Sequence, residues 1–311
     1  MGIQNRQRNR SCHGRFGHFQ WGFFKEVSVY SFWIFLNAIM DRIYWSTGQF
    51  VLGMFKGAAV VAVYAVAIQL QAIYMGFSTA ISGVFLPKVT AMVTKENNEK
   101  AISDLFIRTG RIQYIIIAFI LTGFVVFGKS FIRLWAGSDY EDAYGITLCF
   151  FIPMTVPLIQ NLGIIILQAR NQMKFRSTLY VVIAFVSLVI SIPLSKQYGG
   201  IGCAISIALA LTTGQIIVMN IYYHRVIHID ILDFWKEIGK MSLVPFAIGS
   251  LSFYLFCIYE IHTVQIFIVC IFAFSCIYVP LFWFFGMNAY EKELFVSPVR
   301  RFVGRLQKNL Q

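Results

Sequence analysis

The segment GAAVVAVYAVAIQLQAIYMGFSTAISGVFLP, residues 57–87, runs for 31 residues without a charged side chain. A helix needs about 20 apolar residues to cross roughly 30 Å of hydrocarbon, so this segment is long enough to span a membrane. The whole chain has the same character, because only 13% of its residues are charged, against about 25% in an average soluble domain. The sequence therefore predicts a helical membrane protein.

Similar uncharged runs recur on both sides of this segment. Six of them are Ile112–Gly128, Ala143–Ala169, Ser177–Ser195, Gln197–His224, Met241–Tyr259 and Ile261–Tyr290. A further span, from Val27 to about Leu52, is interrupted only by Asp41 and Arg42 and contains Trp and Tyr, as interfacial segments often do. We therefore predict an all-α, polytopic membrane helical bundle with about eight transmembrane helices.

The basic residues gather in alternate connections between these spans. Of the 26 Lys and Arg residues, 21 lie in the segments 1–26, 88–111, 170–176, 225–240 and 292–308. The opposite connections hold Lys56, Lys129, Arg133 and Lys196 together with Asp139, Glu141, Asp142 and Glu260. By the positive-inside rule, both termini are predicted to be cytoplasmic. The net charge of +12 then belongs to one membrane face, which favours anionic lipids as partners over nucleic acid.

The spacing of spans and charges divides the chain into five parts. These are a basic cytoplasmic leader (1–26), a six-helix membrane bundle (27–224), a cytoplasmic linker (225–240), two additional transmembrane helices (241–290) and a basic cytoplasmic tail (291–311). Within the bundle, the connection 88–111 has apolar residues at near-helical spacing among its charges. This pattern predicts a short helix on the cytoplasmic surface.

Polar side chains of the first span share one side of the predicted helix. At 100° per residue, Asn37, Asp41, Arg42 and Gln49 fall within a single half-circle. Asp41 and Arg42 are successive residues and do not face each other, so each needs another partner. Arginine suits phosphate oxygens, and charged residues at this depth are candidates for a functional site. The alternative is that both residues pair with neighbouring helices and only hold the bundle together.

The second span carries a narrower polar stripe, formed by Tyr64, Gln71, Ser78 and Ser82. Such residues either line a cavity or form hydrogen bonds between helices, and the sequence leaves both readings open.

The sequence predicts no metal site and no cofactor. His224 and His228 have the i,i+4 spacing of a two-histidine site, but neither an intervening carboxylate nor a third ligand accompanies them.

Two segments carry a family resemblance. SFWIFLNAIMDRIYWSTGQFVLGMFKGAAVVAVYAVAIQLQAIYMGFSTAISGVFLPKVT (31–90) resembles the seventh and eighth helices of bacterial oligosaccharide flippases, and ILQARNQMKFRSTLYVV (166–182) resembles their tenth-to-eleventh connection. These flippases belong to the multidrug/oligosaccharidyl-lipid/polysaccharide transporter superfamily. The resemblance covers roughly Val27 to Tyr290 and implies the second six-helix bundle plus two extra helices of a larger transporter. The first bundle is then either lost from a truncated or misassigned gene or supplied separately.

The resemblance also implies a function, which is to flip an oligosaccharide linked to a polyprenyl pyrophosphate across the bacterial cytoplasmic (inner) membrane, for surface polysaccharide or O-antigen biosynthesis. By this resemblance, Arg42 contacts the pyrophosphate, and Asp41 tunes it or takes part in ion coupling. The residues expected to meet sugar hydroxyls are Asn37, Gln49, Tyr64 and Gln71. Partners would include the missing bundle or other polysaccharide-assembly proteins.

Three other readings remain. A drug/cation antiporter of the same superfamily would need a carboxylate-rich cavity, which Arg42 disfavours. A membrane glycosyltransferase or polymerase needs a converging set of acid, base and nucleophile. The acidic cluster Asp139, Glu141 and Asp142 lies in a short loop and is predicted to be a solvated charge run, so we expect no enzyme. Finally, the fragment alone could transport nothing.

Overall fold

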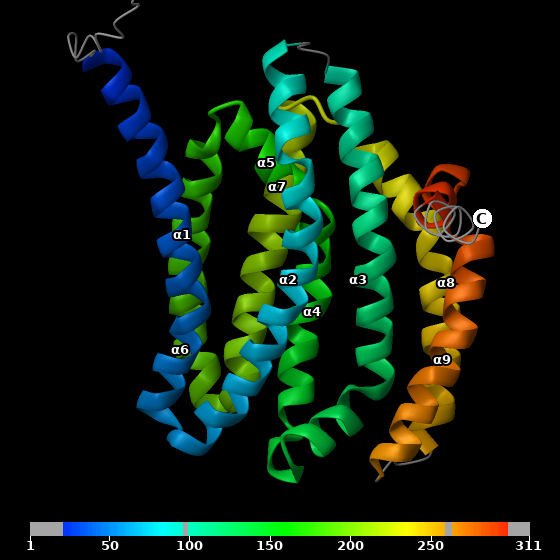
Figure 1. Ribbon diagram of the computed structural model, residues 1–311. Coiled ribbons are helices and arrows are strands. Elements are labelled where there is room, and N and C mark those ends of the chain that lie inside the picture. The colour runs from blue at the N-terminus through cyan, green and yellow to red at the C-terminus, as the bar shows by residue number, and fades with distance from the viewer. Residues whose placement is uncertain (1–20, 96–98, 259–262, 298–311) are drawn as a thin grey trace, which may run out of the picture.

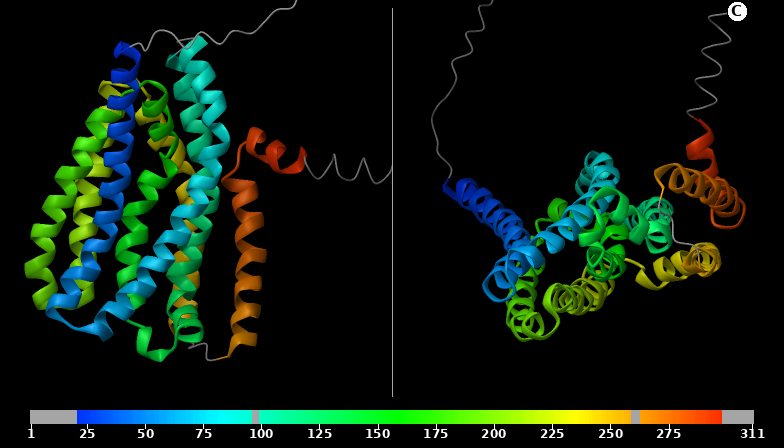
Figure 2. Two further views of the ribbon diagram at one scale, coloured as in Figure 1. Left: turned by 60° about the vertical axis from the view of Figure 1, so that its left-hand side comes forward. Right: turned by 90° about the horizontal axis from the view of Figure 1, so that it is seen from below.

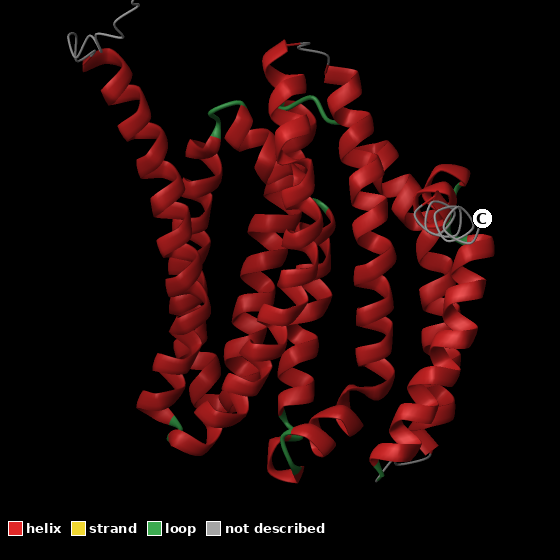
Figure 3. Ribbon diagram, in the orientation of Figure 1, coloured by secondary structure: helices red, strands yellow, loops and turns green. Residues whose placement is uncertain are grey.

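The computed structural model describes residues 21–95, 99–258 and 263–297, and the regular structure in these ranges is helical. Figure 3 shows the helices and their connections. The predicted all-α membrane bundle is therefore confirmed. The elements are α1 (Trp21–Phe55), α2 (Ala58–Lys95), α3 (Glu99–Trp135), η1 (Ser138–Tyr140), α4 (Ala143–Ile159), α5 (Leu162–Ala169), α6 (Met173–Ala210), η2 (Leu211–Val218), α7 (Met219–Arg225), α8 (Ile231–Ile258) and α9 (Val264–Phe285).

Five described helical runs are long and apolar enough to cross a membrane, or six if α4 and α5, bent by 47°, form one broken span. One of the five is the continuous run Met173–Arg225 of 53 residues, which would be roughly 80 Å long if it were straight. It turns back at Gly199, where φ is +61°, and forms two antiparallel legs (Figure 1). If the second leg and α1 are each counted as a separate span, the total becomes the predicted eight transmembrane helices. Polar residues lower the hydropathy of α1, so that number stays a prediction.

The helices alternate in direction, as the charge pattern requires. In Figure 1 the start of α1, the end of α2 and the connections that follow α5 and α7 lie at one end of the bundle. The turn at Gly57, the short helix η1, the turn at Gly199 and the start of α9 lie at the other end. The two sets of connections identified by their charges therefore fall at opposite ends, and which end is cytoplasmic stays a prediction.

Several helices extend beyond the uncharged runs. The predicted surface helix in 88–111 is wrong, because α2 continues to Lys95 and α3 already begins at Glu99. Likewise, α8 begins at Ile231, inside the predicted linker, and residues 289–297 are helical. Charged residues mark where a helix leaves the hydrocarbon, but the helix itself can continue into water, since Lys and Glu are good helix formers there. The division into a bundle and two additional helices stays a prediction.

A close contact between α1 and α2 explains why glycine stands at position 48. The ring of Tyr64 is fully buried, and a Cβ atom added at Gly48 would lie 2.3 Å from the Tyr64 Oη. Small residues at helix interfaces in membranes allow such an approach. The α1–α2 hairpin that carries the predicted polar stripes therefore depends on this glycine.

Replacing Gly48 by alanine tests this packing. We expect Gly48→Ala to lower the free energy of unfolding by about 1–3 kcal/mol, since the added methyl group overpacks a buried ring. Gly53→Ala is the matched control on the same helix, because its Cβ would meet no atom closer than 3.9 Å. Thermal unfolding in detergent measures both variants, and equal midpoints would contradict the assignment.

A buried ion cluster fastens the C-terminal helices to α3. The guanidinium of Arg111, on α3, contacts the carboxylate of Glu291 (Nε to Oε1, 2.5 Å) and that of Glu237 on α8 (Nη1 to Oε2, 2.6 Å). Glu291 also accepts from the backbone N–H of Asn288, whose side chain accepts from the Glu291 N–H. This capping box begins the segment 289–297, which lies crosswise to α9 (Figure 2).

Glu291 is only 1% exposed, so its loss would leave Arg111 buried with two of its four hydrogen bonds. We expect Glu291→Gln to destabilise the protein by about 3 kcal/mol, within the range for broken buried pairs. Glu293→Gln, at an exposed position two residues later, should have little effect. Thermal unfolding checks this difference, and a loss of the same size in both variants would argue against a buried anchor.

Candidate functional site

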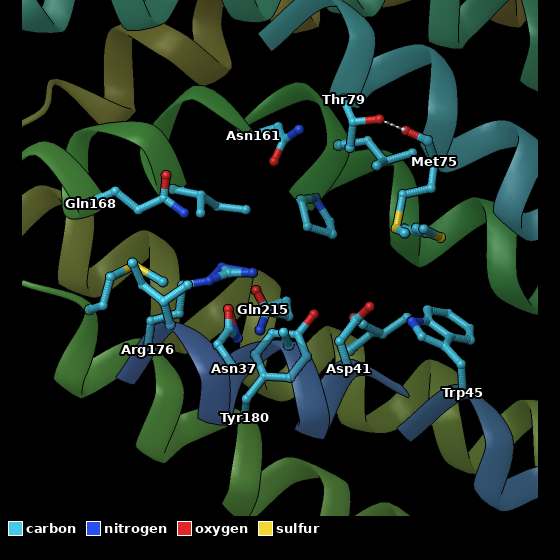
Figure 4. Close-up of a pocket in the computed structure, with 18 residues that line it drawn as sticks. Asn37, Asp41, Trp45, Met75, Thr79, Asn161, Gln168, Arg176, Tyr180 and Gln215 are labelled. Carbon is cyan, nitrogen blue, oxygen red and sulfur yellow. Dashed lines mark hydrogen bonds between the residues drawn. The ribbon is translucent and has the colours of Figure 1, made fainter. Parts of the chain in front are cut away.

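A cavity of about 290 Å³, lined by both apolar and polar side chains, lies between α1, α2, α4, α5, α6 and η2. Figure 4 shows two facing walls. The polar side chains of one wall are Thr79, Asn161 and Gln168, and those of the other are Asn37, Asp41, Trp45, Arg176, Tyr180 and Gln215. Because these groups lie among membrane-spanning helices, they are costly there unless they meet a partner or a ligand.

Arg176, near the start of α6, is the main unsatisfied group of the cavity. Its side chain is buried, with 6% exposure, and its Nε has no hydrogen-bond partner. No carboxylate of the described residues lies within ion-pair distance of it. The guanidinium carbon lies 5.0 Å from the ring centroid of Tyr180, which orients the group toward the space between the walls (Figure 4). A buried arginine without an ion pair is strongly unfavourable, so an anion in the cavity would stabilise it.

Asp41 is the one carboxylate among the residues that line this cavity. Its carboxylate interacts electrostatically with the guanidinium of Arg176 and lies near Trp45 and Tyr180. The pair therefore partly balances the charge of the cavity without closing it. A ligand with both an anionic group and hydroxyl donors would fit these two residues together.

Gln215, on the second leg of the helical hairpin Met173–Arg225, supplies a second unsatisfied donor. It lies in η2, a π-helical turn, and such turns are rare and often accompany functional sites. Its side chain is 4% exposed, and its Nε2 has no hydrogen-bond partner. Two buried donors, Gln215 Nε2 and Arg176 Nε, thus border one cavity and both lack acceptors.

The structure separates the predicted residues of the first span. Asn37 and Asp41 line the cavity. Arg42 lies on the exposed side of α1 and does not line it, because one residue along a helix turns the side chain by 100°. Within the described residues, neither Asp41 nor Arg42 forms an ion pair with a neighbouring helix.

The other predicted residues lie outside the cavity lining. Gln49 is half-buried farther along α1, and Tyr64 is buried under Gly48. Gln71 lies one layer behind the wall, where its Nε2 is 3.5 Å from the Sδ of Met154. Of the two alternatives for the polar stripe on α2, Ser78 forms a hydrogen bond between helices, because its hydroxyl donates to the Leu158 carbonyl oxygen at 2.7 Å.

The sequence did contain a signal for Arg176. Because Arg176 lies in the basic connection 170–176, its charge by itself indicates only membrane topology. However, Tyr180, Ser187 and Ser191 follow it at intervals of four, seven and four residues, which places all four on one helix face. Nothing comparable marks Gln215, because a π-helical turn shifts the helical register in a way that spacing does not reveal.

A second cavity, of about 570 Å³, lies between α3, α4 and α8. It is larger but almost entirely apolar, and the polar atoms along it already have partners. The Thr155 hydroxyl bonds to Tyr74 Oη at 2.8 Å, and the Ser242 hydroxyl bonds to Tyr114 Oη at 2.6 Å. No group there requires a polar ligand, so the smaller cavity is the candidate site.

The acidic cluster near η1 does not form an acid–base centre. Arg133 donates a hydrogen bond to the Glu141 carboxylate and holds the pKa of Glu141 below its ordinary value. Lys129 lies 3.7 Å from the same carboxylate. A general base needs the opposite shift, toward neutral pH. This arrangement disfavours an enzyme centred on these residues.

Comparisons with known proteins agree with the resemblance seen in the sequence. Residues 12–145 match the family described as "Polysaccharide biosynthesis protein". Over 200 residues, 62% of this chain, the sequence is 22% identical to the probable flippase AglR of Haloferax volcanii. That match covers 41% of the relative, so the chain spans less than half of its length. No solved structure matches the chain. The predicted resemblance to flippase-type polysaccharide-biosynthesis proteins is therefore confirmed.

Proposed function

We propose that this chain is part of a flippase that moves a lipid-linked oligosaccharide across the cytoplasmic membrane, and that Arg176 contacts the pyrophosphate of the lipid carrier. The observation that carries the proposal is the burial of Arg176, without an ion pair, beside a cavity among membrane-spanning helices. The similarity to a probable flippase supports the same reading.

Each wall of the cavity offers groups suited to one part of such a ligand. The planar fork of Arg176 matches phosphate oxygens, and Gln215 Nε2 is free to donate to the same group. Asn37, Asn161 and Gln168 carry amides that both donate and accept, as sugar hydroxyls require. Asp41 would accept from a hydroxyl. In this proposal Arg176 takes the role that the resemblance implied for Arg42.

The mouth of the cavity indicates what completes it. Ala38 on α1 and Thr79 on α2 both line the cavity and are exposed, so the space opens between these two helices. The exposed side of α2 there is also lined by small residues, including Gly76 and Gly83, whose added Cβ atoms would meet nothing within 4 Å. We propose that further helices, from another part of such a transporter or from a separate assembly protein, cover this side.

A drug/cation antiporter is the second candidate, and Asp41 is the observation that favours it. A buried arginine in the same cavity would repel a cationic drug, since Coulomb repulsion is strong where water is scarce. Transport of an anionic lipid fits both charged residues better.

The role of Arg176 can be tested by charge removal. We expect Arg176→Gln to weaken binding of a fluorescent short-chain polyprenyl-pyrophosphate disaccharide at least tenfold, because a charge-assisted hydrogen bond contributes about 1.5–3 kcal/mol. Arg176→Lys should restore part of the binding, since it keeps the charge but loses the fork. Binding and flipping are measured with the protein in proteoliposomes.

Arg42→Gln is the matched control, because it removes the same charge from the exposed side of the neighbouring helix and should change binding less than twofold. An uncharged polyprenyl glycoside serves as the second probe and should not distinguish Arg176→Gln from the parent. Equal pyrophosphate binding by the parent and Arg176→Gln would refute the proposal.

A further inference from the structure

The break between α4 and α5 lies at the base of one cavity wall. Helix α4 contains Pro153 and Pro157 and ends at Ile159, and α5 begins at Leu162 after a bend of 47°. The last carbonyl groups of a helix have no partner in the next turn, and hydrocarbon supplies none. The Leu158 carbonyl oxygen accepts a long backbone hydrogen bond, from the Asn161 N–H at 3.3 Å, so it and the Ile159 carbonyl oxygen depend on other helices for further donors.

Two neighbouring helices supply those donors. The Ser78 hydroxyl, on α2, donates to the Leu158 carbonyl oxygen at 2.7 Å. The amide of Gln113, on α3, has one orientation that satisfies both of its ends. Its oxygen then accepts from the Ser82 hydroxyl at 2.5 Å, and its nitrogen donates to Leu158 O at 3.1 Å and Ile159 O at 2.9 Å. Gln113 is fully buried, so these are its partners in place of water.

Gln160, at the break itself, is also fixed by hydrogen bonds to neighbouring helices. The Gln160 Nε2 donates to Asn220 Oδ1 on α7 at 2.8 Å, and the same oxygen accepts from the Trp235 indole on α8 at 3.0 Å. Gly110 on α3 permits the close approach, because a Cβ there would lie 2.9 Å from the Ile159 carbonyl oxygen. Residues 158–160 are thus tied directly to α2, α3 and α7, and through Asn220 to α8.

We propose that Ser78 and Gln113 are positioning residues of the cavity, because they fix the corner from which α5 projects. Asn161 stands at this corner and Gln168 near the far end of α5, opposite Asp41 and Arg176 in Figure 4. Helix α5 has eight residues and is about 12 Å long. A tilt of about 10° at the corner would therefore move its far end by roughly 2 Å, enough to separate a ligand from one wall.

The link from this corner to ligand binding rests on the proposed function, whereas the fixing of the corner does not. The first measurement is therefore made without ligand. Hydrogen–deuterium exchange of the protein in lipid nanodiscs reports local opening of residues 160–169. We expect Gln113→Leu to speed exchange there at least tenfold and Ser78→Ala about threefold, with the amides of α9 unchanged.

Matched controls come from the same chain. Gln69→Leu removes a glutamine from the exposed side of α2, and Ser250→Ala removes a hydroxyl that bonds only within α8. Neither should change exchange in residues 160–169. Ser78→Thr keeps the hydroxyl and should restore the parent rate. Unchanged exchange in Gln113→Leu, or exchange that rises evenly over all helices, would overturn the proposal.

The second measurement separates this proposal from the proposed function. Gln113→Leu should weaken binding of the polyprenyl-pyrophosphate disaccharide by about fivefold. The control Gln69→Leu should keep the thermal midpoint of the parent. Faster exchange at the corner with undiminished binding would refute positioning of the cavity. Faster exchange together with no dependence of binding on Arg176 would instead refute the pyrophosphate site and leave the corner established.

Discussion

The structure depends on one constraint, which is that polar groups within the hydrocarbon layer must find partners inside the protein. Long helices meet it for most of the backbone, and the exceptions lie where helices break. At the end of α4, carbonyl oxygens that have lost their regular helical partners accept hydrogen bonds from Ser78 and, through its amide, from Gln113. At the C-terminal end, the buried Arg111 is satisfied by Glu237 and Glu291. Both solutions join helices that are distant in the sequence, so they also hold the bundle together.

Against this background, the cavity is conspicuous for groups that remain without partners. Arg176 Nε and Gln215 Nε2 are buried and have no acceptor. The other buried polar side-chain atoms without a partner in the described bundle, the hydroxyls of Tyr64, Thr109 and Tyr278, do not border this cavity. An unmet donor beside open space is more informative about function than a paired one, because its cost is removed only when something binds. The contrast with Arg111 is instructive, since the same residue type at similar burial is fully paired there and holds the fold.

The first two helices illustrate how far sequence reasoning reached. Uncharged runs and alternating basic connections predicted a multi-pass helical bundle, and the polar side of α1 included Asn37 and Asp41, which line the cavity. The same reasoning grouped Arg42 with them, although a half-circle of a helix is wide enough to include side chains that face away from a cavity. It also treated residues 170–176 only as a basic connection, since charge near a span boundary is the normal signature of orientation.

The sequence by itself determined that the chain crosses a membrane repeatedly and which of its surfaces are polar, because the length and charge of each run are set locally by the thickness of the hydrocarbon. Only the tertiary structure decided which polar groups meet. The turn at Gly199, the bend after Ile159 and the π-helical turn η2 bring Arg176, Asn161 and Gln215 to one cavity. Each of these changes the direction or register of a helix, and helical spacing along the sequence assumes that neither changes.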